Sequence, residues 1–124
     1  MSNLPKTYKD LLFWKSSFET SKLIIRLSKK LPRTVEVKVV LGQLLRSASS
    51  VGANIAEGYG RFGTKEYSRF LQISLGSANE TEYWLLILKE CVPGLSKEID
   101  MIIEKNIESI KMLASSLKSI RNRG

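Results

Sequence analysis

Hydrophobic residues recur at steps of three and four along most of the chain, a spacing that places them on one face of an α-helix. This pattern predicts four helices, over residues 8–31, 35–57, 64–92 and 96–121. Pro32 and the Pro93-Gly94 pair interrupt it, and glycines at 58, 60 and 63 separate the second helix from the third. No stretch alternates as a strand would. We therefore predict an all-α protein with a single domain over residues 1–124.

Short connections between four helices are typical of an antiparallel up-down four-helix bundle. The predicted core positions are Leu11, Trp14, Phe18, Ser21 and Ile25, widened by Phe13, Ile24, Leu27 and Leu31, in the first helix; Leu44, Ala48, Val51 and Ile55 in the second; Tyr67, Phe70, Leu71, Ser74, Ala78, Leu85 and Leu88 in the third; and Ile99, Ile103, Ile110, Leu113, Leu117 and Ile120 in the fourth. Thr64 and Ser96 are the expected N-caps of the last two helices.

The second helix carries a second face, which is polar and which we call the polar stripe. Its members are Gln43, Arg46, Ser50, Asn54, Glu57 and Arg61. A stripe of mixed amide, hydroxyl, acid and base groups is either a solvated surface or a second contact surface, and the sequence leaves both open. Glu57, together with Glu80 and Glu82 of the third helix, is expected to pair with Arg46, Arg61 or Asn54, across helices or subunits. Alternatively, Glu57 could approach Glu80 or Glu82 as a catalytic carboxylate pair, although a short bundle offers no sugar cleft.

Lys and Arg outnumber Asp and Glu by 20 to 12, and the excess lies in the first half of the chain. Residues 1–62 hold eleven bases and four acids, whereas residues 63–124 hold nine and eight. The candidate nucleic-acid-binding residues are Lys15, Lys22, Arg26, Lys29, Lys30, Arg33 and Lys38. The alternative is a solvated face relieved by Glu19. Since we expect no aromatic platform beside these cations, we predict phosphate contacts without sequence-specific readout.

The sequence offers little for catalysis. It contains no histidine, and its one cysteine, Cys91, has no histidine to activate it. Gly58, Gly60 and Gly63 match GxGxxG, but a helix precedes them where a dinucleotide site needs a strand, so we interpret them as a turn. We expect no enzyme, catalytic residue, cofactor, metal or small-molecule substrate. A single cysteine and the lack of a long apolar run predict a cytoplasmic protein without a membrane span.

Two segments, SVGANIAEGYGR (residues 50–61) and SRFLQISLGSANETEYWL (residues 68–85), resemble the bacterial proteins encoded in intervening sequences of 23S rRNA genes. This family of unknown function is also called S23 or four-helix-bundle proteins, and the accessory variability proteins of diversity-generating retroelements are related to it. The resemblance extends over nearly the whole chain. It implies an up-down four-helix bundle, a homopentameric ring and an association with RNA or a ribonucleoprotein, and it brings no catalytic residues. The alternative is a protein-binding scaffold, for example for a reverse transcriptase.

Overall fold

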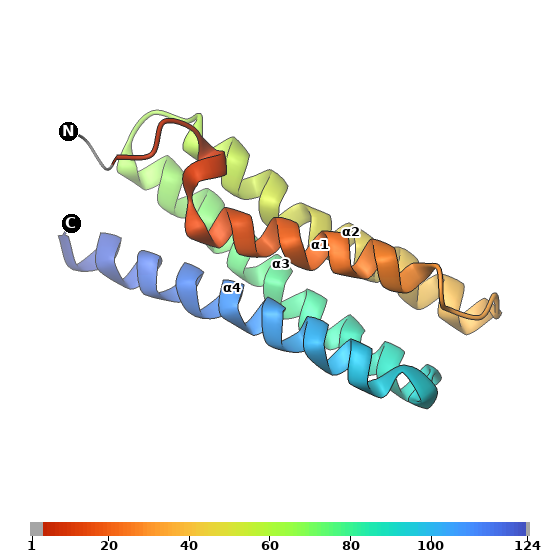
Figure 1. Cartoon of the computed structure of the whole chain (residues 1–124). Coiled ribbons are helices and arrows are strands. Elements are labelled where there is room, and N and C mark those ends of the chain that lie inside the picture. The colour runs from red at the N-terminus through yellow and green to blue at the C-terminus, as the bar shows by residue number, and fades with distance from the viewer. Residues whose placement is uncertain (1–3, 124) are drawn as a thin grey trace.

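Four long α-helices form most of the computed structural model, which describes residues 4–123. They are α1 (Leu12–Ser28), α2 (Val35–Tyr59), α3 (Thr64–Cys91) and α4 (Ser96–Arg123). Short 3-10 helices, η1 (Tyr8–Asp10) and η2 (Pro93–Leu95), precede α1 and α4. Residues 4–123 contain no strand, so the predicted all-α class is confirmed. The helices lie side by side, with the start of α1 and the end of α4 at the same end of the molecule (Figure 1).

The first helix is shorter than the predicted range 8–31. At its N-terminal end, the Asp10 carboxylate accepts hydrogen bonds from the backbone N–H groups of Lys6 and Thr7, and the Thr7 hydroxyl accepts one from Lys9. These bonds close η1 as a separate turn. Leu11 then adopts an extended backbone (φ −73°, ψ 129°), and regular helix begins only after it.

Both predicted N-caps are wrong. Gly63 occupies the N-cap position of α3 at φ +88°, a left-handed conformation that glycine adopts without strain, so Thr64 is already inside the helix. The Ser96 hydroxyl donates to the carbonyl oxygen of Pro93 at 2.7 Å and so completes η2 instead of capping α4. The prediction that the glycines form a turn is confirmed for Gly60, the C-cap of α2, and for Gly63, whereas Gly58 is a buried residue inside α2.

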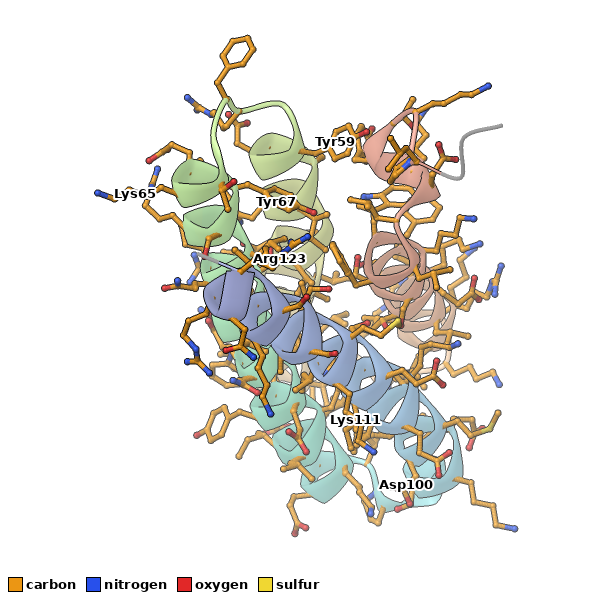
Figure 2. The ribbon with its side chains drawn as sticks, turned by 90° about the vertical axis from the view of Figure 1, so that its left-hand side faces the viewer. Tyr59, Lys65, Tyr67, Asp100, Lys111 and Arg123 are labelled. Atoms are coloured by element: carbon orange, nitrogen blue, oxygen red, sulfur yellow. The ribbon has the colours of Figure 1, made fainter. Side chains whose placement is uncertain are left out.

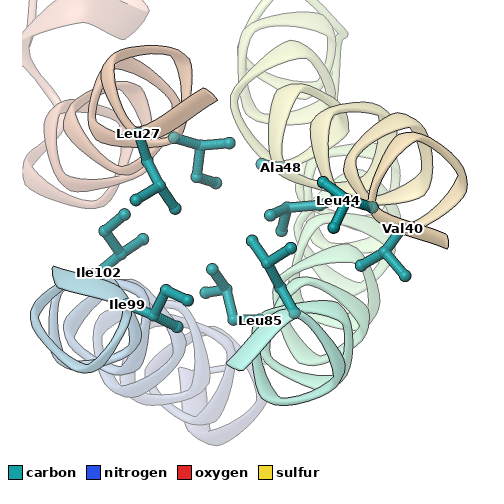
Figure 3. Close-up of a cluster of buried hydrophobic side chains, with 10 residues drawn as sticks. Leu27, Val40, Leu44, Ala48, Leu85, Ile99 and Ile102 are labelled. Atoms are coloured by element: carbon teal, nitrogen blue, oxygen red, sulfur yellow. The ribbon is translucent and has the colours of Figure 1, made fainter. Parts of the chain in front are cut away.

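Side chains from all four helices meet in two clusters of buried apolar residues, the first of which is shown in Figure 3. Cluster one contains Ile24, Leu27, Val37, Val40, Leu44, Ala48, Leu85, Leu88, Ile99 and Ile102. Cluster two contains Phe13, Val51, Ile55, Leu71, Ala78 and Leu113, and it lies toward the end where α1 begins and α4 finishes. The predicted core positions of α2 lie in these clusters, as do most of those of α3.

The core face of α1 differs from the predicted stripe. Phe18 is 48% exposed and Ile25 is 51% exposed, although both were expected inside. The buried residues of α1 are Phe13, Ser16, Ser17, Thr20, Ile24 and Leu27. On α4, similarly, Ile102, Asn106 and Ser109 are buried, while the predicted Ile103 and Ile110 are only partly buried. In both helices the true core face contains polar residues, which an apolar pattern does not count.

A belt of buried polar side chains crosses the interior, and we call it the polar belt. It consists of Ser16, Ser17 and Thr20 of α1, Ser47 of α2, Ser74 and Thr81 of α3, and Asn106 and Ser109 of α4. Ser16 and Ser109 share a hydrogen bond of 2.7 Å, and the Asn106 amide donates to the Ala78 carbonyl at 2.9 Å. Within residues 4–123 no buried side-chain nitrogen or oxygen lacks a partner. The belt is therefore fully hydrogen-bonded, as stable interiors require.

Candidate nucleic-acid interface

The outer surface of α1 carries Lys15, Lys22, Arg26 and Lys29, which we call the basic face. They recur at helical steps and point away from the buried residues of the same helix. Lys22 and Arg26 have side chains that are 41% and 65% exposed. The structure therefore brings these four predicted residues together on one surface.

A single acid interrupts the basic face. The Glu19 carboxylate lies 3.1 Å from the ammonium nitrogen of Lys22 and 3.9 Å from a guanidinium nitrogen of Arg26. The hydrogen bond from Lys22, followed by the charges of Lys22, Arg26 and Lys105, lowers the pKa of Glu19. Glu19 is therefore ionised at neutral pH and cancels one of the four positive charges.

The remaining predicted cations divide between two places. Lys30 pairs with Glu98 of α4 at 3.7 Å, which ties its charge to the neighbouring helix. Arg33, in the α1–α2 connection, and Lys38, in the first turns of α2, are exposed. No carboxylate among the described residues lies within ion-pair distance of Arg33 or Lys38, so both remain available to an anionic partner.

Aromatic rings lie beside the basic face, and the sequence interpretation missed them. Tyr8 meets Trp14 edge-on with ring centres 5.2 Å apart, and Trp14 stacks on Phe18 at 4.8 Å. The ammonium group of Lys22 lies 5.3 Å from the centre of the Phe18 ring. The expectation that no aromatic platform accompanies the cations is therefore wrong. The signal was present in the sequence, because Trp14 and Phe18 alternate with Lys15 and Lys22, but these aromatics had been assigned to the core.

The polar stripe of α2 is partly exposed: Arg46, Glu57 and Arg61 lie at the surface, whereas Ser50 contacts α3. The Asn54 amide donates to the carbonyl and the hydroxyl of Ser50 at 2.8 and 2.9 Å, and the Ser50 hydroxyl also contacts Ser77 of α3 at 3.2 Å. Glu57 pairs with Arg61 at 2.6 Å within the same helix. Each of these stripe residues thus contacts its neighbour one turn away on the same helix.

At the start of the stripe, the Arg46 guanidinium donates to the Gln43 side chain at 3.5 Å. Among residues 4–123 neither Arg46 nor Asn54 meets a carboxylate. The expected cross-helix pairs with Glu80 and Glu82 are therefore not made within one chain.

The carboxylates of α2 and α3 do not approach one another. Thr81 contacts Ser47 and Ser74 contacts Val51, so the two helices run antiparallel, and Glu57 lies opposite the first turns of α3. Glu80 lies roughly ten residues further along, a displacement of about 15 Å at the helical rise. Its carboxylate accepts a hydrogen bond from the Trp84 indole at 3.1 Å instead. The alternative of a catalytic pair between Glu57 and Glu80 or Glu82 is therefore wrong.

Two tyrosines occupy the end of the molecule where α4 finishes. Figure 2 shows Tyr59 and Tyr67 toward the same end as Arg123, with Asp100 at the opposite end. The Tyr59 hydroxyl donates to the carbonyl of Pro5 at 2.9 Å and so ties the first residues to α2. Burial, together with the nearby Tyr59, raises the pKa of Tyr67. Tyr67 is therefore neutral at ordinary pH and offers no phenolate base.

Within residues 4–123 no three His, Cys, Asp or Glu side chains lie close enough together to bind a metal ion. None of the helices in this part of the chain combines the length and the apolarity that crossing a membrane requires.

Comparisons with known proteins point in one direction. A family model described as 23S rRNA-intervening sequence protein matches residues 9–115. The fold is similar to the crystal structure of a protein of unknown function from the S23 ribosomal protein family of Bacteroides thetaiotaomicron, with a TM-score of 0.78 and 33% sequence identity. That similarity covers 86% of this chain and 99% of the other. No match is found among curated proteins.

Proposed function

Because the chain belongs to the 23S rRNA-intervening sequence protein family, we propose that it is a non-enzymatic, oligomeric protein that binds RNA through the basic face of α1. The observation that carries the proposal is the concentration of Lys15, Lys22, Arg26 and Lys29 on one exposed surface with Glu19 as its single acid. Arg33 and Lys38 extend the positive charge around the α1–α2 connection.

The proposed mechanism is neutralisation of phosphates by lysine and arginine. Each contact releases condensed counterions, so log K falls linearly with log salt, by about 0.7 per phosphate for a single strand. Contacts of this kind position the nucleic acid but carry no sequence information. The family name refers to 23S rRNA, which supports RNA as the polyanion.

The protomer in this proposal is an up-down four-helix bundle that assembles into a closed ring, most simply the pentamer implied by the family resemblance. A ring repeats the basic face once in every subunit. Weak contacts then act together wherever one strand reaches several copies, because the second contact is made at a high effective concentration.

The test is charge reversal on the basic face. In the triple variant Lys22→Glu, Arg26→Glu, Lys29→Glu we expect RNA affinity and the salt slope to fall while the helical circular dichroism spectrum is retained. The matched control is Lys97→Glu, Lys111→Glu, Lys118→Glu, which changes the net charge equally on exposed positions of α4, where Figure 2 labels Lys111. Equal weakening by both variants would show a non-specific charge effect. Unchanged affinity in the first variant would place the site elsewhere.

We propose further that a second copy of the chain covers the polar stripe. Glu57 is about half exposed in one chain, and its pair with Arg61 stays within one helix. Removal of a surface ion pair inside one chain costs only about 0.2–1 kcal/mol. We therefore expect Asn54→Ala and Glu57→Ala to weaken the assembly more than they weaken the fold.

Light scattering checks both parts of this claim. A particle of 14.0 kDa for the parent at micromolar concentration would rule out the oligomer. If both alanine variants remained as oligomeric and as stable as the parent while RNA binding disappeared, the stripe would belong to the functional site instead.

A protein-directed scaffold is the second candidate, and one hollow on the surface favours it. A depression of about 330 Å³ between α1 and α4 has a floor that includes Leu23, Leu27 and Ile102, and Met101 at its edge is 67% exposed. A neighbouring reverse-transcriptase gene would favour the scaffold, whereas a location inside an rRNA gene would favour RNA binding. Gene context therefore separates the two candidates.

A further inference from the structure

A pocket of about 310 Å³ lies between α1 and α2, next to the basic face, and we call it the aromatic pocket. One wall is formed by the rings of Tyr8, Trp14 and Phe18. Its other wall is α2, where Gly52, Ala53 and Ala56 expose only small side chains. The volume lies at the lower end of the roughly 300–1,000 Å³ typical of ligand pockets. The shape is thus a slot with an aromatic side and a smooth apolar side.

Small residues of α2 keep this slot open. A Cβ atom at Gly52 would lie 3.4 Å from the indole nitrogen of Trp14 and 3.2 Å from the Ser17 hydroxyl. The indole therefore lies close to the α2 backbone, and the stacked Phe18 ring extends outward from it, 48% exposed. The Ser21 hydroxyl also lines the pocket and has no hydrogen-bond partner among the described residues.

Two lysines lie next to rings of the aromatic pocket, and one of them, Lys22, is also paired with Glu19 at 3.1 Å. No acidic residue lines it. Lys22 lies 5.3 Å from the Phe18 ring, and Lys9 lies 6.0 Å from the Tyr8 ring. Lys15 follows Trp14 on α1 and is exposed, on the side of the helix where it lines the α1–α4 hollow with Glu19. A partner that enters this pocket must therefore combine a flat apolar group with negative charge.

We propose that the aromatic pocket binds an unpaired RNA base, which stacks on the exposed side of Phe18 while Lys22 and Lys15 contact the flanking phosphates. The proposal rests on RNA binding by the basic face and adds that the preferred RNA is single-stranded. The base displaces the Lys22 ammonium from the Phe18 ring, and a flanking phosphate competes with Glu19 for that ammonium. Stacking of bases on aromatic side chains tolerates every base, because each base has a π-face.

This geometry distinguishes single strands from duplexes. In double-stranded RNA the bases are paired and stacked on one another, so only phosphates and 2′-hydroxyl groups reach a protein surface without opening the helix. Duplex RNA and heparin should therefore bind the basic face alone, and only a single strand should engage both surfaces.

The experiment uses Trp14 as its own reporter in a Trp84→Phe background, where it is the single tryptophan. Oligouridine, duplex RNA of the same length and heparin are titrated at matched ionic strength. We expect oligouridine to quench the fluorescence of Trp14, and heparin to leave it unchanged. Phe18→Leu, which keeps an apolar side chain but removes the ring, should weaken oligouridine binding by roughly five- to a hundredfold. Its affinity for heparin and its salt slope should stay as in the parent.

A second variant, Ala53→Met, tests the slot from the other wall. Ala53 is exposed, so a longer side chain fills the pocket without entering the core, and the same selective loss of oligouridine binding is expected. If Phe18→Leu and Ala53→Met bind oligouridine like the parent while the charge-reversal triple does not, the pocket proposal is overturned and phosphate binding stands. If the parent binds none of the three polyanions, both proposals fail. If the emission of Trp14 shifts with protein concentration and does not change when RNA is added, a second copy covers the pocket and the base-binding proposal is wrong.

Discussion

The α2–α3 interface and the α1–α4 interface are both made by adjacent helices, yet the backbones approach to different degrees. At Gly58 a Cβ atom would lie 2.6 Å from the Cβ of Phe70, so α2 and α3 meet with no room for even one methyl group. The Ser74 hydroxyl reaches the Val51 carbonyl at 2.9 Å further along the same interface. Between α1 and α4, surface hollows of about 330, 430 and 580 Å³ follow one another along the helices.

Small residues contribute to the difference. At the α2–α3 interface Ser47, Gly58, Ser74 and Thr81 lie among larger apolar residues and let the two helices pack closely at these points. The α1–α4 interface also has a close point, where Ser16 meets Ser109 at 2.7 Å, but longer side chains such as Leu12, Lys105 and Met112 line a hollow at its rim. The two segments that carry the family resemblance, residues 50–61 and 68–85, lie on the close interface. The resemblance therefore describes packing, whereas the candidate RNA-binding residues lie on α1, in the α1–α2 connection and at the start of α2, outside these segments.

The sharpest way to break this comparison is Gly58→Ala. The added methyl group meets Phe70, whose ring is held between the guanidinium groups of Arg61 and Arg69 at 5.2 and 4.7 Å. Overpacking costs about 1–3 kcal/mol, which exceeds the gain in helix propensity of at most ~1 kcal/mol. We expect a net destabilisation in urea unfolding. Gly76→Ala is the control, because nothing lies within 4 Å of a Cβ there, and it should be stabilising. Equal stabilisation by both changes would show that the close contact is absent.

The open interface should accept a larger side chain. Ser116 lines the hollow that also includes Leu12, Phe13 and Met112. Filling this hollow with Ser116→Leu should stabilise the fold by about 0.5–1 kcal/mol. Ser77→Leu places the same side chain at the α2–α3 interface, where it also breaks the bond to Ser50, and should be destabilising. A loss of stability in Ser116→Leu would mean that the α1–α4 interface is as tightly packed as its counterpart.

The smallest expected effect is a pH dependence of the stability of the fold, contributed by Glu19 at the rim of the α1–α4 interface. The pKa of Glu19 lies below its ordinary value of 4.5, chiefly because Lys22 donates a hydrogen bond to it. Because the pKa of Glu19 is lower in the folded state than in the unfolded state, the ionised carboxylate stabilises the fold above about pH 4.5. This stabilisation is lost as the pH falls through the folded-state pKa. The difference in melting temperature between the parent and Glu19→Gln should therefore shrink from about pH 6 to about pH 3. Glu104→Gln, an exposed acid of α4, serves as the control. A difference that stays constant with pH would show that the Glu19 pairs contribute nothing.

The sequence predicted the elements better than their orientation. Helices α2 and α3 and most of their core positions follow from apolar spacing. The predicted family membership is confirmed by the match over residues 9–115. The core face of α1 was predicted wrongly, because Ser16, Ser17 and Thr20 are buried where an apolar pattern expects leucine. Their hydrogen bonds depend in part on α4, so no pattern within α1 reveals them.

The candidate site was predictable to the same limited degree. Lysines and arginines lie on the outer surface whichever way a helix is rotated, so their positions on the basic face followed from helical spacing. The pair between Lys30 and Glu98 joins residues far apart in sequence, and helical spacing could not predict it. The stacked pair of Trp14 and Phe18 was not predicted, because the apolar pattern places both residues in the core, whereas the observed rotation of α1 leaves Trp14 partly buried and Phe18 exposed.

The polar belt has a consequence for how the helices align. If one helix slid along its neighbours by a turn, about 5.4 Å, the apolar clusters would still find apolar partners. The belt would not, because Asn106 and Ser109 would then face leucine or isoleucine side chains and lose the hydrogen bonds to Ala78 and Ser16. Each stranded polar group costs about 1–3 kcal/mol. The belt therefore fixes the axial register of the helices, whose apolar surfaces alone would tolerate more than one register. A chain with leucine in its place should hold together firmly and yet populate more than one alignment.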